Sequence, residues 1–123
     1  MDRDRFEKIV EQAFEKLPDK FKKAIDNLGV VVEDYPADDI VRQMKLPSRY
    51  HLLGLYQGIP HKHRDTWYGT SPVLPDKISL YQKSIESVCR TDDELEHKIV
   101  EVLIHEIAHY FGMNDEEIRA AGF

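Results

Sequence analysis

Two histidines spaced four residues apart, with a glutamate directly after the first, are the residues of this sequence best suited to chemistry. His105 and His109 would lie one turn apart on one face of a helix, where both imidazoles can bind a single metal ion. Glu106 would then be placed to take a proton from a water bound to that metal. Asp115, three residues beyond Gly112, could add a carboxylate oxygen as third ligand. Such a set is typical of a catalytic zinc site with one position open, and it indicates a metal-dependent hydrolase.

The third ligand has competitors in the sequence. Glu116 is a rival carboxylate, and Asn114 or Asp115 could instead cap a short helix expected over residues 116–121. The two roles are compatible, because one carboxylate oxygen can cap the helix while the other binds a metal. The offset from the histidines favours Asp115 as the ligand.

The phase of the helix that would carry this motif gives a second indication. At about 100° per residue, His105 and His109 fall just outside a broad apolar arc, whereas Glu106 falls inside it. Burying an unpaired carboxylate is costly, and a nearby divalent cation with its water would compensate the charge. The alternative, in which all three residues belong to a solvated helix face, does not fit the position of Glu106. The apolar arc is formed by Leu95, Ile99, Val102, Leu103, Ile107, Tyr110 and Phe111.

The motif His-Glu-x-x-His-x-x-Gly-x-x-Asp at residues 105–115 resembles that of the metzincin clan of zinc peptidases, in the variant where Asp replaces the third His. The sequence is more similar still to a family of very small bacterial zincin-like metallopeptidases. Those proteins also have a Leu-Gly-Leu-Tyr-x-Gly strand, found here at residues 53–58, and a Leu-Pro-Asp-x-Ile-x-Leu-Tyr segment, found at residues 74–81. The methionine turn that metzincins carry downstream has no counterpart here, since Met113 lies inside the motif.

This resemblance implies an α+β, zincin-like minimal metallopeptidase fold in a single domain over residues 1–123. A small mixed sheet of about three to four strands would pack on N-terminal helices and a long active-site helix. The implied activity is peptide-bond hydrolysis, with Zn²⁺ held by His105, His109 and Asp115 and with Glu106 as general base. The implied partner is a peptide or protein substrate.

The resemblance also implies a place for the substrate. In zincins generally, the strand before the active-site helix is a sheet edge whose free backbone groups pair with an extended peptide. The alternative is an ordinary edge strand that binds no substrate and is protected from pairing by Lys77 and Lys83. The corresponding candidates for substrate binding are Ile78, Ser79, Leu80, Tyr81 and Gln82.

Length, charge and cysteine content limit the partners and the cellular compartment that we expect for this protein. The chain has 123 residues, enough for one core, and its net charge of −6 argues against a nucleic-acid partner. No apolar run approaches membrane-spanning length, and the first residues lack the apolar segment of a signal peptide. A lone cysteine, Cys89, excludes an internal disulfide and fits a reducing compartment. We therefore expect a cytoplasmic protein without a membrane partner, with a monomer as the default state.

Periodicity and turn residues predict the elements that must position the motif. A capping box at residues 91–94 would begin the long active-site helix. Gly54 would mark a bulge or a close backbone approach within a strand. The predicted helices span residues 3–17, 21–28, a turn around 40–44, 84–89 and 116–121, and the predicted strands span 30–33, 50–57 and 76–82.

Residues 58–75 are rich in Pro, Gly, His and Asp, which predicts a long surface loop lining the cleft. His61 and His63 have a spacing that could bind a metal, but no further ligand clusters with them in the sequence. Arg64, Tyr68 or one of these histidines could stabilise the oxyanion that forms when water attacks a carbonyl.

Three other functions are compatible with parts of the motif. Two His and a carboxylate also hold non-haem iron, although two His on one helix with Glu106 between them is the zincin arrangement. A small bacterial zinc family thought to process ribosomal RNA has a related His spacing, but it ends in a third His and lacks the glutamate. A metal-stabilised binding module without turnover is the main alternative to an enzyme.

Overall fold

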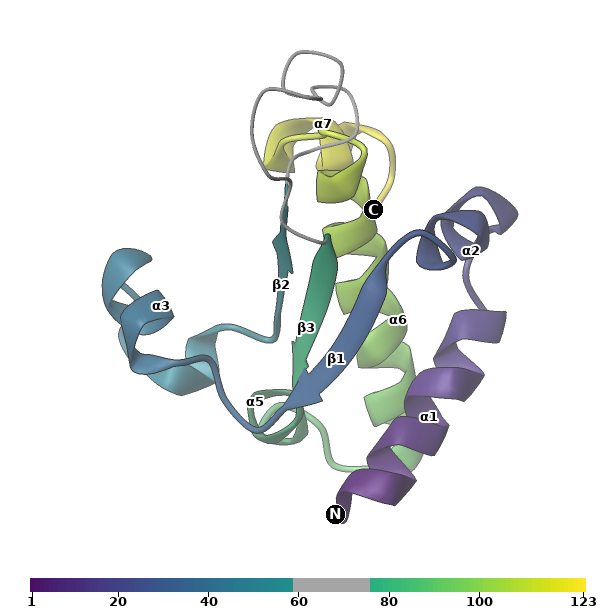
Figure 1. Cartoon of the computed structure of the whole chain (residues 1–123). Coiled ribbons are helices and arrows are strands. Elements are labelled where there is room, and N and C mark those ends of the chain that lie inside the picture. The colour runs from purple at the N-terminus through teal and green to yellow at the C-terminus, as the bar shows by residue number, and fades with distance from the viewer. Residues whose placement is uncertain (59–75) are drawn as a thin grey trace.

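The computed structural model describes residues 1–58 and 76–123. In this part of the chain the sheet lies across the long helix α6, with α1 beside α6 on the same side (Figure 1). The predicted loop residues His61, His63, Arg64 and Tyr68 lie outside the described residues. The elements are α1 (Arg3–Glu15), α2 (Asp19–Ile25), β1 (Gly29–Glu33), α3 (Asp38–Gln43), the 3₁₀ helix η1 (Arg49–His51), β2 (Gly54–Gln57), β3 (Lys77–Tyr81), α5 (Gln82–Glu86), α6 (Asp92–Tyr110) and α7 (Asp115–Ala120).

The three strands form a mixed sheet in the order β1-β3-β2, which confirms the predicted α+β class. β1 runs parallel to β3, from Gly29 opposite Lys77 to Glu33 opposite Tyr81. β2 runs antiparallel to β3, with Gly54 opposite Leu80. Among the strands of residues 1–58 and 76–123, the two at the edges of this sheet are therefore β1 and β2.

The prediction that residues 78–82 form a sheet edge is wrong. β3 is the central strand, so its backbone groups pair with β1 and β2 and are not free to bind an extended peptide. Its side chains are buried on both faces, which is typical of a central strand; Ser79 and Tyr81 are as buried as Ile78 and Leu80. Gln82 is not in the strand but begins α5, where its side-chain amide donates to Met1 O and to Glu86 Oε2, each at 2.9 Å.

Apolar side chains at helical spacing bury α1 and α6 against each other and against one face of the sheet. The sheet contributes Ile78 and Leu80, both fully buried. The apolar arc predicted for α6 is this buried face, and Glu106 lies within it as expected. The two helices contribute Phe6, Ile9, Val10, Ala13, Leu95, Ile99, Val102, Leu103, Ile107 and Tyr110.

The ends of α6 are set by its sequence. Thr91 Oγ1 accepts a hydrogen bond from the amide of Glu94 at 3.1 Å, which caps the first turn as predicted. At the other end Gly112 has φ of 84°, and the amide of Met113 donates to Ala108 O at 3.0 Å. This glycine-dependent turn reverses the chain directly after the motif and brings α7 back towards α6.

Strand β2 begins later than predicted, because residues 49–51 form a 3₁₀ turn. Ser48 Oγ caps this turn by accepting from the amide of Tyr50 at 3.2 Å. Gly54, the first residue of β2, is a point of close approach: a Cβ there would lie 2.5 Å from Val102 Cγ1. The absence of a side chain at Gly54 lets β2 lie directly against α6.

Candidate metal centre

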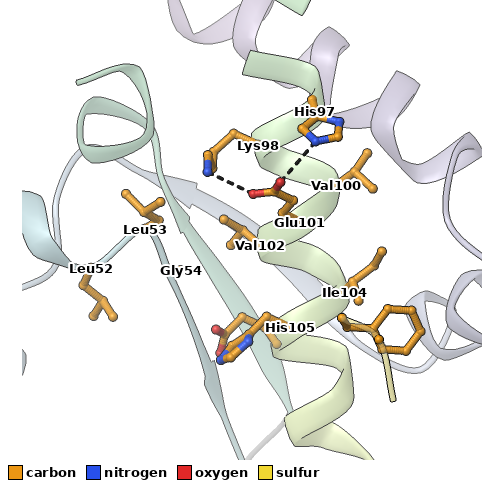
Figure 2. A pocket seen from close by; sticks show the side chains of 13 residues that line it. Leu52, Leu53, Gly54, His97, Lys98, Val100, Glu101, Val102, Ile104 and His105 are labelled. Atoms are coloured by element: carbon orange, nitrogen blue, oxygen red, sulfur yellow. Dashed lines mark hydrogen bonds and ion pairs between the residues drawn. The ribbon is translucent and has the colours of Figure 1, made fainter. Parts of the chain in front are cut away.

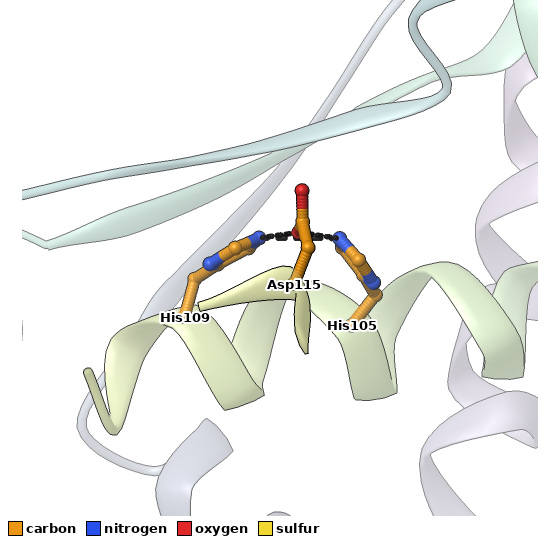
Figure 3. A group of neighbouring side chains, drawn as sticks. All are labelled: His105, His109 and Asp115. Carbon is orange, nitrogen blue, oxygen red and sulfur yellow. Dashed lines mark hydrogen bonds and ion pairs between the residues drawn. The ribbon is translucent and has the colours of Figure 1, made fainter. Parts of the chain in front are cut away.

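His105, His109 and Asp115 meet at one point on the surface of α6 (Figure 3). The Nε2 atoms of the two histidines are 3.1 Å apart, and Asp115 Oδ1 is 3.3 Å from each of them. The histidines come from the last two turns of α6, and Asp115 is the first residue of α7, delivered by the turn at Gly112. Helix spacing and the turn together produce this convergence.

The donor atoms suit a zinc ion in type and in spacing. Ligand atoms about 2.0–2.1 Å from a tetrahedral zinc lie roughly 3.3 Å from one another, close to the separations found here. Asp115 and His105 have side chains that are 69% and 43% exposed, so the point where the three groups meet is open to solvent. Three protein ligands with an open side are typical of a catalytic rather than a structural site.

A backbone contact fixes the orientation of His109. Its Nδ1 atom lies 3.0 Å from Met113 O. Because a carbonyl oxygen only accepts, Nδ1 carries the proton and Nε2 keeps its lone pair for a metal. The turn after α6 thus presents Asp115 and also selects the tautomer of His109.

Asn114, and not Asp115, caps α7. Asn114 Oδ1 accepts from the amide of Glu117 at 2.8 Å, and Glu117 Oε1 accepts from the amide of Asn114 at 3.1 Å, which makes a reciprocal capping box. The carboxylate of Asp115 is therefore not needed as a cap. Among the described residues, Glu116 is not part of the group that could hold a metal.

Glu106 lies beside the candidate metal ligands but points inward from α6. Its side chain is only 9% exposed, and Oε1 accepts a hydrogen bond of 2.8 Å from the amide of Tyr56 on β2. Burial raises the pKa of Glu106 from 4.5 to about 7, although the Tyr56 amide and His109 oppose the rise. A carboxylate with a pKa near neutrality suits a group that must both accept and return a proton.

Burial also acts on His105, whose pKa is lowered chiefly by desolvation and then by the neighbouring His109. A lowered pKa favours the neutral imidazole, which is the form that binds a metal.

Two hollows meet at the candidate centre. One, of about 630 Å³, lies over His105, His109 and Asp115 and reaches Tyr56. The other, of about 680 Å³, runs from His105 and Glu106 along α6 (Figure 2). It lies between α6 and the segment 52–54, and its walls include Leu52, Leu53, Val102 and Ile104.

Three charged or titratable groups line the far end of the second hollow. Glu101 is 2.9 Å from Lys98 Nζ through one oxygen and 3.1 Å from His97 Nε2 through the other (Figure 2). A hydrogen bond from Lys98 is the main cause of the lowered pKa of Glu101, and it keeps this carboxylate ionised.

The structure brings together four of the predicted site residues, namely His105, Glu106, His109 and Asp115. It leaves residues 78–81 in the centre of the sheet and Gln82 at the start of α5. The sequence reasoning missed Tyr56, whose amide holds Glu106. The available signal was the Leu-Gly-Leu-Tyr-x-Gly segment, in which Gly54 permits the contact of β2 with α6.

Comparison with protein families gives a match to the zincin-like metallopeptidase family over residues 25–123. This match spans most of the chain, and the protein belongs to that family. No curated protein matches the sequence. A solved structure of similar fold is a conserved hypothetical protein (TTHA0227) from Thermo thermophilus, 24% identical, with a TM-score of 0.55 over 90% of this chain and 94% of that one. In the described ranges, 1–58 and 76–123, no helix is long and apolar enough to cross a membrane.

Proposed function

We propose that this protein is a zinc-dependent peptidase that hydrolyses peptide bonds at the centre formed by His105, His109 and Asp115. The observation that carries the proposal is the convergence of three metal-binding atoms beside a buried carboxylate of raised pKa. Membership of the zincin-like metallopeptidase family supports the choice of zinc and of a peptide or protein substrate.

Glu106 is the proposed general base. It takes a proton from the attacking water as the new C–O bond forms, and it returns that proton to the amine nitrogen as the C–N bond breaks. A zinc ion at the three ligands would lower the pKa of water and polarise the substrate carbonyl. His109, held by Met113 O, keeps Nε2 directed at the centre throughout.

The substrate is proposed to lie along β2 rather than β3. β2 is the sheet edge that contacts α6, and the amide of Tyr56 points away from β3 because it donates to Glu106. Backbone groups alternate in direction along a strand, so Gly54 presents its N–H and C=O at the same outer edge. An extended peptide paired there would place a side chain in the largely apolar hollow beside Leu53 and Val102.

The first experiment measures zinc content by mass spectrometry on protein purified without added metal. The wild type is compared with Asp115→Ala and with Glu116→Ala, a matched control that removes the neighbouring carboxylate. We expect about one zinc per wild-type chain, as one such site implies, loss in Asp115→Ala and retention in Glu116→Ala. A wild type that contains no zinc and takes none up would overturn the proposal.

The second experiment tests catalysis with a peptide library on zinc-loaded protein. Glu106→Gln keeps the size of the side chain and removes its basicity, so it should retain zinc and lose roughly 10²–10⁴-fold in rate. Full peptidase activity in Glu106→Gln would exclude the proposed base.

A metal-stabilised binding module without turnover is the second candidate. The specific observation in its favour is the hydrogen bond from Tyr56 N–H, which occupies an oxygen of Glu106. This candidate predicts that zinc-loaded protein binds peptides of the library without cleaving them, and that Glu106→Gln leaves the binding unchanged.

A further inference from the structure

The outer edge of β1 presents backbone groups that bond to no other described residue. β1 pairs with β3 on one side only. The amide of Gly29 donates to Asp76 O at 3.2 Å, so Gly29 faces β3, and alternation places Val31 and Glu33 towards β3 as well. Val30 and Val32 therefore direct their N–H and C=O groups away from the sheet.

One of these four groups is satisfied within the fold. Arg3, on α1, donates from Nη1 to Val32 O at 2.8 Å. The N–H and C=O of Val30 and the N–H of Val32 have no hydrogen-bond partner in the described part of the chain. A row of such groups is a template for another strand.

A groove of about 400 Å³ lies between this edge and α1. Its apolar lining is Val10 and Phe14 of α1 together with the three valines of β1. Val31 is 39% exposed. No proline or lysine interrupts β1 to protect this edge, as edge strands often require.

The charged side chains that line the groove carry one sign. Glu7 and Glu11 lie on its α1 side, Glu33 is exposed at the end of β1, and no described Lys or Arg lines the groove. A second copy of the chain docked edge to edge would bring these carboxylates against identical ones, which is unfavourable. Charge complementarity instead selects a basic partner.

We propose that this groove binds an extended segment of another protein in which pairs of apolar residues and pairs of basic residues follow one another. The segment adds as a fourth strand beside β1, its backbone bonding to both groups of Val30 and to the N–H of Val32. Because the side chains of a strand alternate between its two faces, this pattern gives the face towards α1 both apolar side chains, on Val10 and Phe14, and basic ones, near Glu7 and Glu11. This surface is at the opposite edge of the sheet from β2 and uses none of the metal ligands (Figure 1). Binding at this groove can therefore be tested independently of peptidase activity.

The test is a nuclear magnetic resonance titration of the full chain with the peptide acetyl-Lys-Lys-Val-Val-Lys-Lys-amide, whose two faces each carry both residue types. We expect amide shifts at Val30 and Val32, and affinity that falls with added salt. Acetyl-Glu-Glu-Val-Val-Glu-Glu-amide, with the same pattern and the opposite charge, should not bind. Shifts confined to the surroundings of His105 and His109, or no shifts at all, would overturn the proposal.

Two variants that change the net charge by the same amount distinguish binding at the groove from a general effect of charge. Glu11→Gln and Gln12→Lys each make the chain more positive by one, and both residues are exposed on α1, but only Glu11 lines the groove. Glu11→Gln should weaken binding about two- to fivefold, the scale of one exposed charge pair, and Gln12→Lys should not weaken it comparably. Equal weakening by both variants would mean that binding follows net charge and not this groove.

A third variant addresses the backbone. Val30→Pro removes the outward N–H, which β1 does not use for β3, and prolines are tolerated at such edge positions. It should lower peptide affinity more than Val30→Ala does, a control that keeps the N–H and also loses the packing of this half-buried side chain against the core. Unchanged affinity, or a wild type that dimerises with rising concentration through the amides of Val30 and Val32, would overturn the proposed occupant.

Discussion

The backbone amide of Tyr56 donates a 2.8 Å hydrogen bond to Glu106 Oε1, and so a sheet edge holds the side chain proposed as general base. The contact joins residues that are 50 positions apart in the sequence. It gives a buried carboxylate one donor and fixes its direction between β2 and the candidate metal ligands.

Removing that donor should destabilise the protein. Tyr56→Pro deletes the outward N–H without breaking a bond to β3, and it leaves a buried carboxylate short of a partner, at a cost of about 1–3 kcal/mol. Tyr56→Ala keeps the amide and is the matched control, because it also loses the ring, whose centroid lies 6.0 Å from that of Tyr110. Urea unfolding of the metal-free proteins measures the difference, and equal midpoints for the two variants would show that the bond contributes little.

The raised pKa of Glu106 predicts how the metal-free protein responds to pH. The folded state holds this proton up to a pH of about 7, whereas an unperturbed glutamate releases it near 4.5. Between these values the folded state binds more protons than the unfolded state, so stability falls as pH rises, in total by on the order of 3 kcal/mol. Glu106→Gln should remove this slope, which urea unfolding at a series of pH values in the presence of a chelator measures. An unchanged slope would assign the effect to other groups.

The close contact of β2 with α6 predicts that Gly54 resists substitution. A Cβ in Gly54→Ala would lie 2.5 Å from Val102 Cγ1 and 3.1 Å from Ser79 O, so the strand must shift, costing about 1–3 kcal/mol. Gly29→Ala is the matched control, because its nearest neighbour, Asp76 O, would be 3.9 Å away. Thermal unfolding compares the two, and Val102→Ala should restore part of the loss at Gly54.

The cap of α7 should influence metal affinity indirectly. Asn114→Ala removes the side chain that bonds the amide of Glu117, which costs about 1 kcal/mol of helix stability. Because Asp115 begins this helix, zinc affinity should fall by up to about tenfold, with no ligand atom deleted. Competition with a chromogenic chelator measures the change; Asn114→Asp keeps a capping oxygen and should retain most of the affinity.

Much of the candidate metal centre was predictable because its residues are close together in the sequence. The spacing of His105 and His109, the helix phase that buries Glu106 and the glycine turn before Asp115 are all short-range features. The choice between Asn114 and Asp115 as cap could also have been made, since Asn114 and Glu117 have the spacing of a capping box.

The order of the sheet was not predictable in the same way. Alternation of Ile78 and Leu80 with Ser79 and Tyr81 indicates a strand with one polar face, but tertiary packing buries all four side chains. Which strand lies in the middle depends on contacts between residues far apart in sequence, and so the sequence predicts a sheet edge at β3, which the structure places between β1 and β2. The single domain, the cytoplasmic location and the monomeric state stay predictions.

Helix α7 has six residues, too few to be stable alone, and one of them, Ile118, is buried at 1% exposure. Asp115 is the point at which an ion shared with the histidines of α6 would tie this helix down. Such an ion would hold the carboxyl-terminal segment against α6, in addition to any chemistry at the centre. Trimming of that segment by a carboxypeptidase would then be slow in loaded protein and fast after chelation, which offers a measure of metal occupancy that needs no substrate.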